Sequence, residues 1–156
     1  MSFLIFGVTE FAVRFFSAVF GALTLMVIYT MGKDLHSSRL GFIAAMLFGL
    51  NPFVSFYARQ GQFDTALVFF LSLAILYLIR YESRGGIHFA LLGGMAIGAA
   101  LMTKLFVGFG IPLAYFFWKA TTHDGKDPLW KPLAVSLGMA LLVSAPWYVY
   151  MTIVRG

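Results

Sequence analysis

Charge and cysteine are scarce in this sequence. Its 156 residues include no cysteine, and Asp, Glu, Lys and Arg together make up 11%, against about 25% in ordinary soluble domains. Without cysteine the chain can form no disulfide framework, no Cys-ligated zinc or iron–sulfur site and no thiol nucleophile. Hydrophobic residues instead make up 61%, and a soluble domain of this length could not bury so much apolar surface. These values exclude an ordinary soluble domain, a disordered chain and a nucleic-acid-binding module.

The few charged residues divide the chain into six uncharged stretches, namely residues 15–32, 40–58, 65–79, 85–103, 105–118 and 132–154. A bilayer core of about 30 Å requires roughly 20 apolar residues in a helix. Four stretches approach or reach that length, and the two short ones can span if flanking Lys and Arg side chains extend to the interface. Backbone groups in lipid must be hydrogen-bonded within their own segment. We therefore predict an all-α membrane bundle of about six transmembrane helices, with residues 1–156 forming a single transmembrane region.

The basic residues predict the orientation of these helices. If Lys104 separates two spans, seven Lys and Arg residues lie on one side of the membrane and four on the other. Fusing those two spans would divide the basic residues five to five, so the positive-inside rule favours six spans. Pro112 also disfavours one long helix there. The segment before Phe15 is then predicted outside, and because the first nine residues are too short to span, we expect a further helix upstream.

Five ionisable residues gather at the predicted outer ends of the helices: Glu10, Arg14, Arg59, Asp64 and Lys104. Ionisable groups at membrane depth are costly and are often functional. Two or three cations there suit a lipid phosphate, because Arg can donate paired hydrogen bonds to phosphate oxygens and Lys supplies a compact charge. Structural roles stay open as alternatives: Glu10 with Arg14 on one helix face, or Arg59 with Asp64 as a surface ion pair. Lys104 could likewise be a plain turn residue.

Other motifs are few. The three histidines lack metal-ligand spacing, and the sequence has no Ser-His-Asp set, P-loop or dinucleotide fingerprint, so no metal site or cofactor is predicted from this chain. Gly94 and Gly98 form a G-x-x-x-G pair, which allows close helix approach, and we expect it to serve packing inside the bundle rather than dimerisation. From its residues alone, the chain is predicted to be a polytopic membrane protein with an outer-face anion site and an undetermined oligomeric state.

Four stretches in order resemble the membrane core of the GT-C superfamily of lipid-dependent glycosyltransferases: FGVTEFAVRFFSAVFG, LGFIAAMLFGLNPFVSFYARQGQFDTALVFF, GMAIGAALMTKLFVGFGIPL and SAPWYVYM. The most similar branch contains the protein O-mannosyltransferases, the aminoarabinose transferase of lipid A and the rhizobial galacturonosyltransferases. The resemblance covers nearly the whole chain. No motif is specific alone, and it is their order and spacing that indicate the family.

This resemblance implies a multi-pass enzyme of a prokaryotic inner membrane that moves a sugar from a polyprenyl or dolichyl phosphate to a lipid, glycan or protein hydroxyl at the outer face. It implies that Arg59 and Lys104 bind the donor phosphate, that Asp64 orders the site and that Arg14 is structural. Membrane lipids are further expected partners, and use of a divalent metal by the complete enzyme stays open.

The resemblance also implies that important parts of the enzyme lie outside this chain. The family's catalytic acidic pair lies in a first external loop upstream of the matching residues, and Glu10 is the nearest acid here. We therefore expect a fragment without the first helix, the first external loop and the C-terminal part, and inactive alone. The alternative is a small non-enzymatic membrane protein that binds lipid phosphates or acts as a transport or assembly subunit.

Overall fold

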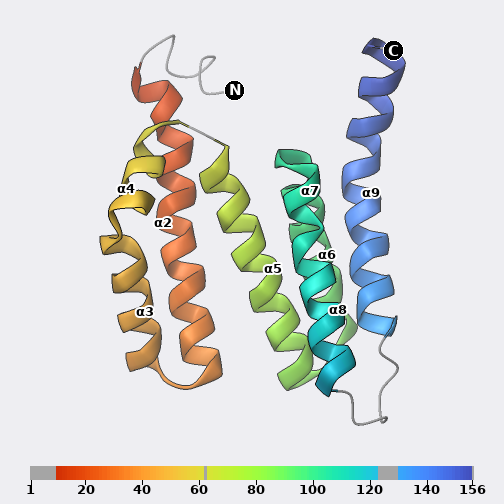
Figure 1. Cartoon of the computed structure of the whole chain (residues 1–156), viewed down its shortest axis with the longest axis horizontal. Coiled ribbons are helices and arrows are strands. Elements are labelled where there is room, and N and C mark those ends of the chain that lie inside the picture. The colour runs from red at the N-terminus through yellow and green to blue at the C-terminus, as the bar shows by residue number, and fades with distance from the viewer. Residues whose placement is uncertain (1–9, 62, 123–129, 156) are drawn as a thin grey trace. The chain divides into compact units, whose positions relative to one another are not determined.

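The computed structural model describes residues 10–61, 63–122 and 130–155, and all regular structure within these ranges is helical (Figure 1). This confirms the predicted all-α class. The chain divides into two compact units, Met1–Ser72 and Leu73–Gly156. Within each unit the helices lie side by side, and the chain reverses its direction several times (Figure 1).

The first unit contains α2 (Glu10–Leu35), α3 (Ser38–Leu50), α4 (Pro52–Arg59) and the beginning of α5 (Asp64–Arg84). The chain reverses after α2, where the Ser37 hydroxyl accepts a 3.3 Å hydrogen bond from the backbone N–H of Leu40 and caps α3. Two glycines let α2 and α3 touch at the backbone. A Cβ built on Gly32 would lie 2.5 Å from the Cα of Gly41, so no side chain fits at this crossing.

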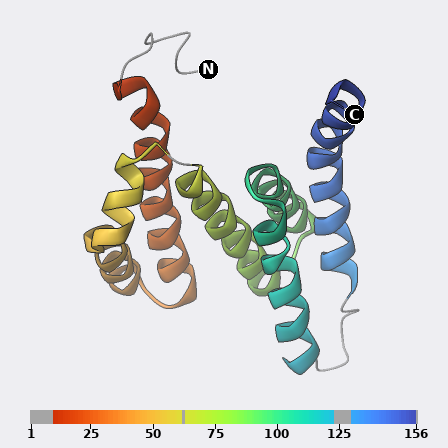
Figure 2. The ribbon, with the colours of Figure 1, turned by 45° about the horizontal axis from the view of Figure 1, so that its top comes forward.

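The second predicted span, residues 40–58, is not one continuous helix. It is interrupted at Asn51, whose backbone is extended (φ −65°, ψ 123°), and α4 starts at Pro52 with a different inclination (Figure 2). Proline lacks an N–H group and disfavours helical geometry in the residue before it, which explains the break. The Asn51 side chain then accepts a 2.9 Å hydrogen bond from the N–H of Phe53 and starts the new helix.

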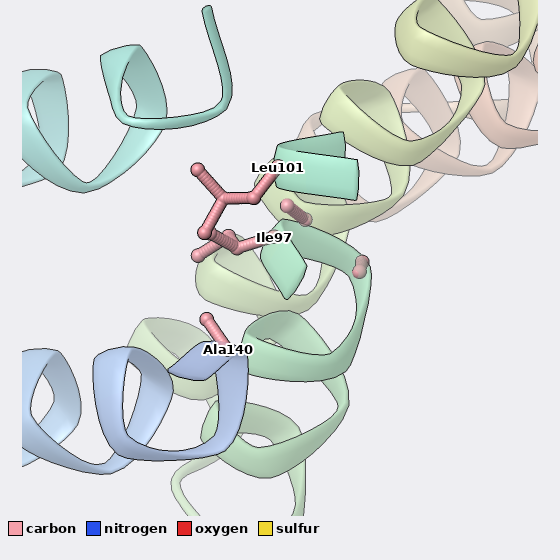
Figure 3. Close-up of a cluster of buried hydrophobic side chains, with 5 residues drawn as sticks. Ile97, Leu101 and Ala140 are labelled. Atoms are coloured by element: carbon pink, nitrogen blue, oxygen red, sulfur yellow. The ribbon is translucent and has the colours of Figure 1, made fainter. Parts of the chain in front are cut away.

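The second unit contains the rest of α5 together with α6 (Ile87–Thr103), α7 (Leu105–Gly108), α8 (Gly110–Thr122) and α9 (Trp130–Arg155). Its apolar core forms where α5, α6 and α9 meet and includes Ala74, Ile97, Leu101 and Ala140, the last three labelled in Figure 3. Small residues among the larger ones bring the helix backbones close together. The core is therefore built on short interhelical distances.

The glycine pair in α6 confirms the prediction that it packs inside the bundle. A Cβ on Gly94 would lie 2.5 Å from the carbonyl oxygen of Ser136, and one on Gly98 would lie 2.8 Å from the Cβ of Val143, both on α9. The Ser136 hydroxyl also donates a 3.0 Å hydrogen bond to the carbonyl of Ala90 on α6. Close backbone approach and an interhelical hydrogen bond are typical of membrane helix pairs.

The break between the fourth and fifth predicted spans is also confirmed. Lys104 is extended (φ −146°, ψ 104°) between α6 and α7. The fifth span, predicted over residues 105–118, has a second interruption at Phe109, which separates α7 from α8. Pro112 lies in the first turn of α8, where its missing N–H removes no helical hydrogen bond.

A polar cluster connects α5 and α8 at the opposite end of the second unit from Lys104. The Lys119 ammonium donates a 2.6 Å hydrogen bond to a carboxylate oxygen of Glu82, and the Tyr115 hydroxyl donates to the other oxygen. Both partners of the ion pair are largely buried. This cluster fixes α8 against the last turn of α5.

Three helical segments are long and apolar enough to cross a membrane: Arg14–Leu35, Asp64–Arg84 and Lys131–Val154. The shorter apolar segments are Ser38–Leu50, Ile87–Thr103 and Leu105–Thr121. Many large apolar side chains on these helices are exposed, including Phe106, which is 90% exposed, and Ile153, which is 77% exposed. Such surfaces are stable in lipid, because there they are not exposed to water and the free-energy cost of that exposure does not arise.

Candidate functional site

Two arginines far apart in the sequence line one open pocket in the first unit. The pocket has a volume of about 630 Å³ and is lined by Arg14, Pro52, Ser55, Phe56, Arg59 and Gln60. Arg14 comes from the start of α2, and all the other lining residues come from α4 and the residue after it. The pocket therefore lies where the first membrane-length segment begins.

The local sequence explains why α4 presents this face. Residues 52, 55, 56 and 59 follow the i, i+3, i+4, i+7 spacing of one helix side, so the helix started by Pro52 places Arg59 on the side of the pocket. Arg59 lies in the last turn of α4, where the negative end of the helix dipole favours a cation. The Ser55 hydroxyl donates a 3.3 Å hydrogen bond to the carbonyl of Gly49, which ties α4 back to α3.

The opposite side of α4 lines a second pocket of about 280 Å³ that is mainly apolar. Phe53, Val54 and Tyr57 contribute to it from α4, together with residues of α2, α3 and α5. Asp64, half-buried at the start of α5, is among its lining residues. Arg59 and Asp64 thus face different pockets, and the role of Asp64 in ordering the site stays a prediction.

Lys104 lies at an exposed turn of the second unit, held by backbone hydrogen bonds on both sides. Its N–H donates to the carbonyl of Ala100 at 3.0 Å, and its carbonyl accepts from the N–H of Gly108 at 3.0 Å. The Tyr148 hydroxyl, from α9, donates a 2.7 Å hydrogen bond to the carbonyl of Leu101 in the last turn of α6. These contacts fix the direction of the turn, while the predicted sharing of one phosphate by Lys104 and Arg59 stays a prediction.

The sequence predicted that Arg14 and Arg59 both lie at the outer ends of the helices, but not that they line one pocket. No sequence spacing connects the two, because they come from different helices and meet only through the packing of α4 on α2. Glu10 is the first residue of α2, and its side chain lies outside the described part of the chain, as does its predicted pairing with Arg14. Among the described residues, no group of three His, Asp or Glu side chains is arranged to hold a metal ion.

Comparison with known proteins assigns the family. The family described as dolichyl-phosphate-mannose-protein mannosyltransferase matches residues 1–150. This chain belongs to that family. Membership of this family confirms the resemblance to the GT-C superfamily that the four stretches indicated.

Three curated relatives of this chain, all from bacteria, illustrate the match. An undecaprenyl phosphate-alpha-4-amino-4-deoxy-L-arabinose arabinosyl transferase of Pseudomonas savastanoi is 28% identical over 92% of this chain and 28% of its own length. A second transferase of that name, from Pseudomonas fluorescens, is 27% identical over 92% of this chain and 27% of its own length. An uncharacterized protein of Aquifex aeolicus is 24% identical over 99% of this chain and 31% of its own length. The chain thus spans less than a third of each of these relatives, and no solved structure matches it.

Proposed function

We propose that this chain forms the donor-binding part of a glycosyltransferase that transfers a sugar from a polyprenyl phosphate to a lipid, glycan or protein acceptor at the outer face of a prokaryotic inner membrane. The observation that carries this proposal is the family match over residues 1–150. Relatives named as undecaprenyl-phosphate sugar transferases support the class of donor. The basic pocket beside α4 supports a phosphate ligand.

In the proposed reaction the acceptor hydroxyl oxygen attacks the anomeric carbon of the donor sugar. The bond from that carbon to the phosphate oxygen breaks, and the polyprenyl phosphate leaves with the bonding electrons. A carboxylate takes the hydroxyl proton. Arg59 and Lys104 bind the donor phosphate and stabilise the charge that develops on it as it leaves.

Substituting the two proposed phosphate ligands tests this function. The protein is expressed from its native gene with any flanking sequence that the gene encodes, and transfer is measured with undecaprenyl-phosphate aminoarabinose and with dolichyl-phosphate mannose. Arg59→Ala and Lys104→Ala are each expected to lower transfer at least 100-fold while membrane insertion stays normal, because the leaving phosphate loses fixed positive charge. Arg39→Ala, which removes an exposed arginine at the other end of the first unit, is the matched control and is expected to retain full transfer.

Two results would contradict the proposal. Full transfer by both variants would refute the phosphate-binding roles of Arg59 and Lys104. A wild-type protein that binds undecaprenyl phosphate but transfers neither sugar to any lipid, glycan or protein acceptor would instead favour the non-enzymatic lipid-binding alternative.

A further inference from the structure

The pocket between α2 and α4 contains a residue to which the family resemblance gives no ligand role. Arg14 and Arg59 line the same cavity, although the family resemblance implied a structural role for Arg14. Both residues are exposed, and the pocket that they line is open. The structure thus brings two permanent positive charges to one open pocket.

We propose that the pocket between α2 and α4 is a two-arginine site that binds the phosphate group of a membrane lipid, with Arg14 as the second ligand beside Arg59. The inference deepens the proposed function and rests on it for the choice of a polyprenyl phosphate as ligand. It assigns the second cationic contact to Arg14 within the first unit, whether or not Lys104 also contributes.

The chemistry of the lining residues favours a phosphate over other anions of the membrane surface. Each guanidinium carries five N–H donors in a planar fork and can bind two phosphate oxygens at once. Gln60 adds a side-chain amide that can donate to a third oxygen. The polyprenyl phosphate that leaves in the proposed reaction is a phosphate monoester, with three terminal oxygens and a charge between −1 and −2 at neutral pH, which two arginines and one amide can satisfy.

The position and remaining lining of the pocket favour a lipid-borne phosphate over a free one. Lipid headgroups lie at the ends of membrane-spanning segments, and Arg14, which lines the pocket, is the first residue of a segment long enough to span a bilayer. Pro52 and Phe56 add an apolar wall, and Phe56 is 56% exposed. A ligand with a charged head and an apolar chain can contact both kinds of surface at once.

Binding is measured directly, without the transfer reaction. The protein is reconstituted in phosphatidylcholine nanodiscs, and radiolabelled undecaprenyl monophosphate is titrated in a scintillation proximity assay. Undecaprenol, which lacks the phosphate, and inorganic phosphate, which lacks the lipid, are used as competitors. We expect wild-type protein to bind undecaprenyl monophosphate, with undecaprenol competing at least tenfold more weakly and inorganic phosphate only at millimolar concentration.

Variants of the protein then show which side chains bind the phosphate. Arg14→Ala and Arg59→Ala are each expected to weaken binding about tenfold, the loss of one charge-assisted contact. Arg14→Lys keeps the charge but loses the planar fork and is expected to weaken binding about threefold. Arg39→Ala, with the same loss of charge away from the pocket, is expected to bind as tightly as wild type. If Arg14→Ala folds poorly, as judged by helicity and size-exclusion behaviour, Arg14→Lys and Arg14→Gln provide the test.

Several outcomes would overturn the inference. Wild-type affinity in the Arg14 variants together with loss in Arg59→Ala would show that Arg14 is not a ligand. If undecaprenol competes as well as undecaprenyl monophosphate, the protein does not recognise the phosphate. If inorganic phosphate competes equally well at micromolar concentration, the protein does not recognise the lipid chain. Because none of these measurements needs sugar transfer, a failure of the proposed enzyme activity would be seen separately as phosphate binding without transfer.

Discussion

The contact between α6 and α9 provides a sharp test of how the second unit is held together. Gly94 faces Ser136, and an added Cβ would lie 2.5 Å from its carbonyl oxygen and 2.8 Å from the Cβ of Met139. The carbonyl oxygen is a backbone atom and the Cβ is bonded directly to the backbone, so neither atom can rotate away from the added methyl group. Gly94→Ala therefore has to push α6 and α9 apart.

The magnitude follows from three effects. Overpacking a close contact costs about 1–3 kcal/mol. Separating the helices also weakens the 3.0 Å hydrogen bond from Ser136 to the carbonyl of Ala90, and interhelical hydrogen bonds in membranes contribute about 0.6 kcal/mol on average. Alanine favours the helix over glycine by up to about 1 kcal/mol, which opposes both losses. We expect Gly94→Ala to lower the free energy of unfolding by about 1–3 kcal/mol.

Gly138→Ala is the matched control, since it makes the same chemical change on α9. An added Cβ at Gly138 has no neighbour within 4 Å, so this variant is expected to be as stable as wild type or up to about 1 kcal/mol more stable.

Because the chain contains no cysteine, single cysteines introduced on α6 and α9 can carry a fluorophore pair that reports their separation. Unfolding is then followed in mixed micelles of increasing SDS content. Equal stability of the two alanine variants would refute the close α6–α9 contact.

Three further results are expected. Tyr148→Phe removes the hydrogen bond to the last turn of α6 and should lower the free energy of unfolding by about 1 kcal/mol in the same SDS titration; an unchanged midpoint would contradict this contact. Lys119→Met leaves the largely buried carboxylate of Glu82 without its cation and should cost about 1–3 kcal/mol, and adding Glu82→Gln should recover part of that loss. Reporter fusions after Gly61 should report the outside of the membrane and those after Gly125 the inside, whereas the same side for both would refute the six-span topology.

Much of the helix pattern followed from the sequence because charged residues are too costly to leave inside a bilayer. The uncharged stretches 15–32 and 65–79 lie within α2 and α5, and Lys104 separates α6 from α7 as predicted. The break at Asn51 was missed, although Asn-Pro is a known helix-ending signal. Counting residues between charges is insensitive to proline, because proline changes backbone geometry without adding charge.

Composition and short-range spacing were enough to predict the all-α class and the packing of Gly94 and Gly98 inside the bundle, and the resemblance of four stretches in order indicated the family. That Arg14 lines a pocket with Arg59 could be seen only once the helices were placed together in space. The reason is physical: local spacing fixes which residues share a face of one helix, but two residues on different helices meet only through the way those helices pack. In this chain that packing depends on the turn at Asn51, which gives α4 its own direction, and on the contact between α4 and α2, whose residues together line the pocket.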